Sequence, residues 1–279
     1  MPASGVKEFY STVEYISWAD RRGLTYDEKY LIERYLDKKG KTLEAGTGGG
    51  RILFEMKDLG FTSLHGFDFV PGFIARAKER DMSHSISFEV QDATSLFYED
   101  SSFDQIVYLQ QFICVLDDAA ARTKALKEAH RILRVGGTAL FSFLSFRTKS
   151  AGPVYPAYLG YLYVVRKLRR SDRSIRYFPY NYRGGRLNLP SLLLGTGPYL
   201  YRYTLREAYD ALREVGFNVT AVGSREQINR GVMYKSIDEM EGKSIRKAIY
   251  FVCTKLTVLL VGLVGSDYSK FIAPMMAAT

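Results

Sequence analysis

The sequence predicts an α/β fold in which a parallel sheet is covered on both faces by helices. Three observations lead to this prediction. Apolar runs of strand length alternate with segments of helical periodicity. Two capping boxes of the form Thr-x-x-Glu begin at Thr25 and Thr204. Glycines stand where two of the helices should stop, at Gly40 and Gly216. With 279 residues, the chain is long enough to bury the core that such a fold needs.

The first half of the chain alternates strands and helices in regular order. A helix begins at the Thr25 capping box and continues to about Leu36. Pro71 suits the first position of a later helix. Between these two helices, apolar residues recur at helical spacing in Ile52, Leu53, Met56 and Leu59. Strands are expected in four runs: Lys41–Glu44, Ser63–Asp68, Ile86–Gln91 and Gln105–Leu109.

The same alternation continues after the fourth strand. Asp118–Arg134 is expected to form a helix that Gly136 and Gly137 end, and its inner face carries Ala125, Leu126, Ala129, Ile132 and Leu133. A nearly all-apolar fifth strand, Thr138–Leu144, follows. The helix that begins at the second capping box has an apolar face of Leu205, Ala208, Leu212 and Val215. The last two strands are expected at Phe217–Val222 and Ala248–Thr254.

The middle of the chain differs in composition from both flanks. Between Arg166 and Arg186 there are eight Lys and Arg residues against one acid, Asp172. Ten of the 21 tyrosines lie between Tyr155 and Tyr203. We therefore expect four segments: N-terminal helices and the first half of the α/β domain at 1–147, an insertion at 148–202, the rest of the same domain at 203–255, and an apolar tail at 256–279.

A glycine-rich run, Gly46-Thr47-Gly48-Gly49-Gly50, follows the first strand. A strand, a glycine turn and a helix N-terminus form an edge at which backbone N–H groups can meet a ligand closely. A phosphate-binding loop is excluded because no Lys follows at the required spacing, and the dinucleotide pattern fails where Arg51 replaces its third glycine. The acid Glu44, directly before the glycines, would repel a pyrophosphate. It suits a cationic ligand that carries an ammonium and a sulfonium.

With these residues the chain resembles the class I S-adenosylmethionine-dependent methyltransferases. The resemblance covers about residues 42–143 and 203–217. It depends on motifs in the family's order: Leu43–Arg51, Gly66–Asp68, Gln91–Ala93 with Ser102–Asp104, and Ala129–Gly137. It implies a Rossmann-like, doubly wound sheet of seven strands, mostly parallel with the last strand antiparallel, and a lid-like insertion after strand five. It also implies S-adenosylmethionine as cofactor and S-adenosylhomocysteine as product.

The resemblance implies roles for particular residues. The glycine-loop backbone would lie against the methionyl part of the cofactor, and Glu44 would reach its ammonium directly or through water. Asp68 would accept both ribose hydroxyls, because a carboxylate has two acceptor oxygens. Asp92 would accept the adenine amino group, and Tyr10 or Tyr15 would fold over the cofactor. The implied cofactor-binding residues are Glu44, Gly46, Thr47, Gly48, Gly50, Asp68, Phe69, Asp92, Ala93, Leu109 and Gln110.

Methyl transfer of this kind is an in-line displacement, for which the protein mainly positions the acceptor and excludes water. The sequence indicates no catalytic base, since no histidine falls at a suitable place. His65, His84 and His130 are too widely spaced for a metal site, and Cys114 and Cys253 are expected to be core thiols. No metal is therefore expected. Arg51 is expected on the surface of its helix.

The acceptor is open to several interpretations. The insertion is expected to be a lid over a small-molecule or lipid-like acceptor. Its basic and aromatic residues also allow RNA binding or contact with a membrane surface. RNA is disfavoured because Leu109-Gln110-Gln111-Phe112 lacks the [DNS]-P-P-[YFW] signature of many base-amine methyltransferases. A non-catalytic scaffold that keeps the cofactor fold is a further alternative.

The composition indicates the compartment. The N-terminus lacks the apolar stretch of a secretory signal, and no run of 18 or more uncharged apolar residues is present. Two cysteines cannot make a disulfide framework. We expect a cytoplasmic protein, with peripheral membrane contact through the insertion or the apolar tail as an alternative. The sequence does not indicate an oligomeric state.

Overall fold

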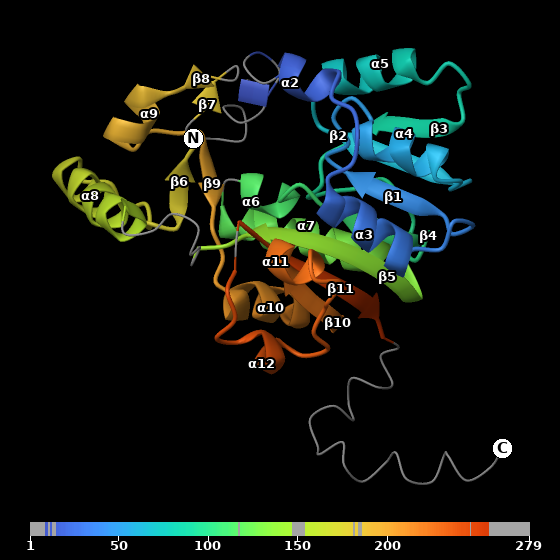
Figure 1. Cartoon of the computed structure of the whole chain (residues 1–279). Coiled ribbons are helices and arrows are strands. Elements are labelled where there is room, and N and C mark those ends of the chain that lie inside the picture. Colours follow the sequence, from blue (N-terminus) through green and yellow to red (C-terminus); the bar gives the residue numbers. More distant parts are fainter. Residues whose placement is uncertain are drawn as a thin grey trace, which may run out of the picture.

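The computed structural model describes residues 9–10, 12, 15–116, 118–146, 154–180, 182–183, 186–245 and 247–256. Within them, one seven-stranded sheet has the strand order β10-β11-β5-β4-β1-β2-β3 (Figure 1). The last strand, β11, runs antiparallel to both of its neighbours, whereas the pairs among β1 to β5 are parallel. The strands are Thr42–Ala45 (β1), Leu64–Asp68 (β2), Ile86–Val90 (β3), Phe103–Tyr108 (β4), Leu133–Leu144 (β5), Phe217–Ser224 (β10) and Ala248–Lys255 (β11).

Helices cover both faces of the sheet, which confirms the doubly wound prediction. One face packs against Tyr26–Tyr35 (α3), Arg51–Asp58 (α4), Pro71–Arg80 (α5) and Arg225–Ile228 (α11). The other face packs against Phe112–Val115 (α6), Ala119–Ile132 (α7), Leu205–Glu214 (α10) and Ile237–Met240 (α12). Both predicted capping boxes form, at the starts of α3 and α10.

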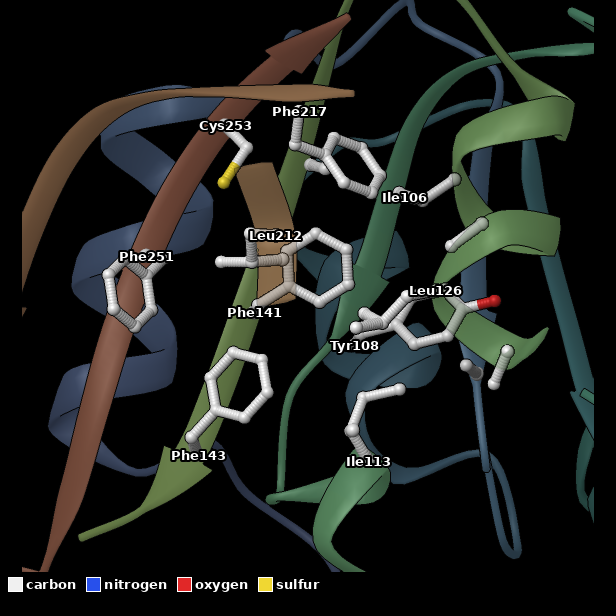
Figure 2. Close-up of a cluster of buried hydrophobic side chains, with 14 of the residues drawn as sticks. Ile106, Tyr108, Ile113, Leu126, Phe141, Phe143, Leu212, Phe217, Phe251 and Cys253 are labelled. Carbon is white, nitrogen blue, oxygen red and sulfur yellow. The ribbon is translucent and has the colours of Figure 1, made fainter. Parts of the chain in front are cut away.

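Side chains alternate between the two faces along each central strand, as the pleat requires. In β4, Ile106 and Tyr108 point into the core on the α7 and α10 side, whereas Val107 belongs to the core on the opposite side. Figure 2 shows Tyr108 and Phe141 of neighbouring strands packed with Leu126 of α7. This apolar layer holds the strands in register, so that the carboxyl ends of β1, β2, β4 and β5 meet at one edge of the sheet.

The fifth strand begins earlier than its apolar run predicts. Helix α7 ends at Ile132, and β5 begins at Leu133 instead of Thr138. Leu133 pairs with Phe103, and Thr138 pairs with Gln105, so the extra residues form a bulge in β5. Gly136, with a φ of 74°, lies in this bulge. The two glycines therefore shape the start of the strand and do not end the helix.

The insertion stands beyond the carboxyl edge of the sheet, at the end where α6 lies (Figure 1). It contains Val154–Leu168 (α8) and Leu189–Leu194 (α9). Two small antiparallel sheets join Tyr177–Pro179 (β6) to Tyr199–Tyr201 (β9), and Tyr182–Arg183 (β7) to Arg186–Leu187 (β8). The chain rejoins the main domain at Tyr203, whose N–H donates to the carbonyl of Leu144 at 2.8 Å.

A short helix, Tyr15–Ala19 (α2), precedes the domain and packs on α5. None of the described helices has the length and apolar character needed to cross a bilayer. The apolar tail expected at 256–279 lies outside the described residues, except for Leu256.

Candidate functional site

The glycine run forms a tight loop between β1 and α4. Gly46, Gly48 and Gly50 have φ angles of 63°, 54° and 83°, in the left-handed region that favours glycine. The loop is crowded from outside, because a Cβ on Gly49 would lie 1.8 Å from the carbonyl oxygen of Ala19. Arg80 fastens this contact by donating to the carbonyls of Ala19 and Gly49 at 2.9 and 2.7 Å. Helix α2 is therefore docked on the loop.

Asp68 ends β2 with its carboxylate directed at the loop. One carboxylate oxygen accepts the N–H of Gly48 and the other accepts the N–H of Val70, both at 3.0 Å. Burial raises the pKa of Asp68 to about 6, although these N–H donors act in the opposite direction. Each carboxylate oxygen can accept more than one hydrogen bond, so Asp68 keeps acceptor capacity toward a ligand.

Glu44 lies inside the protein beneath the same loop. It is 1% exposed, and the hydroxyl of Thr47 donates to its carboxylate at 2.6 Å. Burial raises the pKa of Glu44 to about 8, while the Thr47 hydrogen bond and the nearby Arg51 lower it. A cation bound at the loop would favour the ionised carboxylate.

A first cavity opens between the glycine loop, the end of β2 and the segment after β4. Six of the predicted cofactor residues line it: Gly46, Gly48, Asp68, Phe69, Leu109 and Gln110. Its other lining residues are all apolar or aromatic: Tyr10, Trp18, Phe73, Phe112 and Val115. The arrangement combines a carboxylate, exposed backbone and several aromatic faces. It can therefore hold a ligand that has hydroxyl groups and a flat ring.

Five other predicted residues do not line this cavity. Glu44 lies beneath the loop, Thr47 and Gly50 are buried residues of the loop itself, and Ala93 is buried in the core. Asp92 is exposed, and its carboxylate accepts the N–H and hydroxyl of Thr94, both at 2.8 Å. Its role toward adenine stays a prediction.

A second, larger cavity of about 720 Å³ lies between the sheet edge and the insertion. The insertion contributes an apolar and aromatic wall that includes Tyr155, Tyr158 and Phe178. Two residues, Trp18 and Gln110, line both cavities. The two spaces therefore adjoin at the end of β4.

The segment after β4 has an unusual backbone at this junction. Gln110 and Gln111 have φ angles of 56° and 59°, which residues other than Gly and Asn rarely adopt. Gln111 is held there because its N–H donates to the hydroxyl of Ser142 at 2.8 Å. The side-chain oxygen of Gln110 is buried without a hydrogen-bond partner among the described residues. Backbone strain and an unused acceptor together are typical of a binding site.

One residue at the site, Arg51, does not lie where the sequence predicts it. Two others, Trp18 and Phe112, were not predicted as site residues. Arg51 does not lie on the surface, since it is 3% exposed and forms two hydrogen bonds with Glu28, at 2.7 and 2.8 Å. Trp18 has no recognisable motif, yet its indole N–H is buried without a partner among the described residues. Phe112 packs its ring against Gly46, where a Cβ would lie 2.3 Å from the ring. Trp18 is the one tryptophan in the sequence, and this was the feature that could have pointed to it as a site residue.

Comparisons with known proteins agree with this geometry. Residues 43–141 match the family described as methyltransferase domain. The Geobacter sp. (strain M21) ubiquinone/menaquinone biosynthesis C-methyltransferase UbiE is 30% identical over 156 residues, which cover 53% of this chain and 62% of that protein. The family match and the fold of the structural neighbours support the class I S-adenosylmethionine-dependent methyltransferase family. A methyltransferase domain with this fold implies S-adenosylmethionine as cofactor.

Two further comparisons give similar proteins. The mouse eEF1A lysine and N-terminal methyltransferase is 28% identical over 146 residues, which are 47% of this chain and 21% of that protein. A structure of an S-adenosylmethionine-dependent methyltransferase from Methanosarcina mazei superposes with a TM-score of 0.60 at 20% identity, covering 81% of this chain and 97% of that one. The chain therefore spans about a fifth of the mouse protein and about three fifths of the Geobacter protein.

The residues present fit this cofactor. The glycine loop presents its backbone to the first cavity at Gly46 and Gly48, where the absence of side chains lets a ligand approach closely. Asp68 offers acceptors to hydroxyl groups, and Phe69 and Trp18 offer ring faces. The indole N–H of Trp18 and the amide oxygen of Gln110 are buried polar atoms without partners among the described residues.

Proposed function

We propose that this methyltransferase transfers the methyl group of S-adenosylmethionine to a small-molecule or lipid-like acceptor held in the second cavity. The observation that carries the proposal is the junction of the two cavities at Trp18 and Gln110. One cavity has the predicted cofactor residues, and the other has the insertion as its wall. An acceptor in the second cavity would lie next to the cofactor and be shielded from water by the insertion.

Each residue of the first cavity would contact a different part of the cofactor. Asp68 would accept the ribose hydroxyls, Phe69 would pack on the adenine, and the glycine loop would hold the methionyl part. Glu44 would compensate the ammonium charge from beneath the loop. Leu109 and Gln110 would border the sulfonium. The cofactor supplies an activated methyl group on that sulfonium, so the protein's task is to bind and orient both molecules.

Asp92 and Ala93 keep their predicted roles near the adenine. Asp92 is exposed at the end of β3, where it is accessible to a ligand. We propose that Asp92 gives up its hydrogen bonds with Thr94 when it accepts the adenine amino group.

The contacts of the insertion argue against the RNA alternative. Arg166 donates to the carbonyls of Ser174 and Tyr177 and is 4% exposed. Arg173 lies over the ring of Tyr199 at 4.2 Å, and Arg176 pairs with Glu207 at 2.6 Å. Several of the basic residues that suggested a phosphate-binding face thus make contacts within the insertion or join it to α10.

Exposed apolar side chains on the insertion support a lipid-like acceptor. On α8, Tyr163, Val164 and Leu168 are 58%, 53% and 78% exposed. On α9, Leu193 and Leu194 are each 52% exposed. Lys167 and Arg170 are exposed and are close to Leu168 in the sequence, and such a mixture of cations and apolar side chains suits the interface of an anionic membrane. We propose that the insertion contacts a membrane peripherally and takes its acceptor there.

The test uses the purified chain, methyl-labelled S-adenosylmethionine and a cell extract divided into lipid, small-molecule, RNA and protein fractions. Label in the lipid or small-molecule fraction, absent with Asp68→Ala, is the expected result. Label in RNA or protein alone would overturn the acceptor class. Sedimentation with anionic vesicles tests the membrane contact. Binding that Leu168→Ser and Leu194→Ser together reduce would support it, and equal binding of this variant would contradict it.

A further inference from the structure

The second cavity carries an excess of positive charge. Among the described residues that line it, the cations are Arg21, Arg51, Arg202, Arg225 and Lys247, whereas Glu28 is the one carboxylate. Arg51 pairs with Glu28 at 2.7 Å, and Arg225 pairs with Asp27 at 2.6 Å. The described lining thus holds more cationic than anionic side chains.

Among the cations that line the second cavity, Arg202 is the one whose buried charge most requires a counter-ion. It forms no ion pair with any carboxylate of the described residues. Its Nε is buried and has no hydrogen-bond partner there, and its Nη1 donates to the carbonyl of Ser145 at 3.3 Å. Burial lowers the pKa of Arg202, but a guanidinium stays protonated in proteins. A desolvated charge without a counter-ion is costly.

The backbone of Arg202 is held by the main sheet and not only by the insertion. The next residue, Tyr203, forms a bridge with Ser145, directly after β5. Its carbonyl accepts the N–H of Phe146 at 2.7 Å. On the other side, the N–H of Arg202 donates to the carbonyl of Arg176 at 2.9 Å. The backbone of Arg202 is thus anchored where the insertion meets the carboxyl edge of the sheet.

Aromatic side chains surround this guanidinium. Its central carbon lies 4.3 Å from the ring centre of Phe178 and 5.9 Å from that of Tyr155. Tyr158 continues the same wall of the cavity. Stacking of this kind orients a guanidinium and allows its N–H groups to bind an oxyanion.

We propose that the methyl acceptor carries an oxyanion that pairs with Arg202, together with an apolar or aromatic body that packs on Tyr155, Tyr158 and Phe178. This inference depends on the proposed function, since it describes the acceptor of that same site. Arg202 would then select anionic acceptors over uncharged ones of the same shape. It is a positioning and specificity residue, and no step of the methyl transfer passes through it.

The test is a binding measurement with two matched probes at saturating S-adenosylhomocysteine. Anilinonaphthalene sulfonate has an oxyanion on an aromatic body, and phenylnaphthylamine has a similar body without the charge. Competition between them on the wild-type chain gives the preference for the anion. A hydrogen bond to a charged group contributes enough for about a tenfold preference or more.

Three variants assign this preference to a residue. Arg202→Gln should weaken binding of the sulfonate at least about tenfold and leave the uncharged probe nearly unchanged. Arg202→Lys should retain an intermediate affinity, because it keeps the charge and loses the planar fork. Lys167→Gln is the matched control, since it removes a charge from the exposed side of α8, outside the cavity.

Each outcome has a separate meaning. Equal affinity of wild-type and Arg202→Gln for the sulfonate, with S-adenosylhomocysteine still bound, would overturn the inference about Arg202. A loss as large in Lys167→Gln would place the probe on the exposed face of α8 and would also overturn it. If the wild-type chain binds no S-adenosylhomocysteine, the proposed function itself fails. Should Arg202→Gln not fold, the wild-type competition and Arg202→Lys still decide the question.

Discussion

The carboxylate of Asp68 accepts a hydrogen bond from the backbone N–H of Gly48 at 3.0 Å. This bond joins the end of β2 to the loop after β1, across 20 residues of chain. Asp68 therefore builds the glycine loop and also faces the cavity that the loop borders. The two tasks make it the residue whose replacement should affect the cofactor most.

Replacing Asp68 with Ala should weaken the binding of S-adenosylhomocysteine at least about tenfold, because hydrogen bonds to a charged group contribute about 1.5–3 kcal/mol each. Asp68→Asn should weaken it less, since the amide oxygen can still accept the Gly48 N–H. Isothermal calorimetry measures both. Asp58→Ala, an exposed acid on α4, is the control. Unchanged affinity in Asp68→Ala would remove the ribose assignment.

The affinity for the cofactor should rise with pH. Burial raises the pKa of Asp68 to about 6 and that of Glu44 to about 8 in the free protein. Binding of a cation favours the ionised carboxylates, so at low pH it must first remove a proton. Each of these two carboxyl groups should lower the affinity for the cofactor by up to about tenfold for every pH unit below its pKa.

Titrations between pH 6 and pH 9 check this dependence, and the affinity should become constant above about pH 8. Asp68→Asn should show a smaller slope near pH 6 than the wild type. An affinity that is constant or falls over this range would contradict the proposed charge compensation by Glu44.

Trp18 should report cofactor binding directly. It is the one tryptophan of the chain, and it lines both cavities. S-Adenosylhomocysteine should therefore change the intrinsic fluorescence of the protein with the same Kd that calorimetry gives. Trp18→Phe should abolish the signal and weaken binding by about tenfold at most, because one neutral hydrogen bond contributes about 0.5–1.5 kcal/mol. A bound cofactor that leaves the fluorescence unchanged would place it away from Trp18.

Gly49→Ala should destabilise the protein, because the new Cβ would lie 1.8 Å from the carbonyl oxygen of Ala19. Relief of this clash requires α2 to move away from the loop, with a cost of about 1–3 kcal/mol. Gly160→Ala is the matched control on α8, where a Cβ meets nothing within 4 Å and helix propensity improves. Thermal unfolding compares the two, and an equal Tm for both variants would show that α2 is not docked as described.

Arg51→Ala should cost about 3–5 kcal/mol of unfolding free energy, since it leaves Glu28 as a buried charge without its partner. Arg134→Ala removes an exposed pair with Asp104 and should cost less than about 1 kcal/mol. Urea unfolding measures both. Equally small losses of unfolding free energy in Arg51→Ala and Arg134→Ala would mean that the Arg51–Glu28 pair is accessible to water.

Local patterns were sufficient to predict most strands and helices, whereas the antiparallel last strand was implied by the family resemblance. The apolar runs of β1 to β3 and the capping boxes at Thr25 and Thr204 agree with the structure within a few residues, because they depend on neighbours in sequence. The bulge that extends β5 to Leu133 was not predicted, since it depends on pairing with Phe103 of another strand.

The site residues that belong to a sequence motif could be predicted. Asp68 and the glycine loop were located from their spacing, and the structure brings them into contact. Trp18 and Arg202 were not indicated, because each reaches the site from a segment without a motif. The burial of Arg51 was also missed, since its partner Glu28 lies on α3, more than 20 residues away. Such contacts are made only when distant segments pack together.

Calorimetric titration of the purified chain with S-adenosylmethionine, S-adenosylhomocysteine and NAD tests the cofactor site as a whole. The site described here predicts micromolar binding of both adenosyl ligands and no binding of NAD, because Glu44 would repel a pyrophosphate and Arg51 replaces the third glycine of the dinucleotide pattern. Binding of NAD, or failure of both adenosyl ligands to bind, would contradict it.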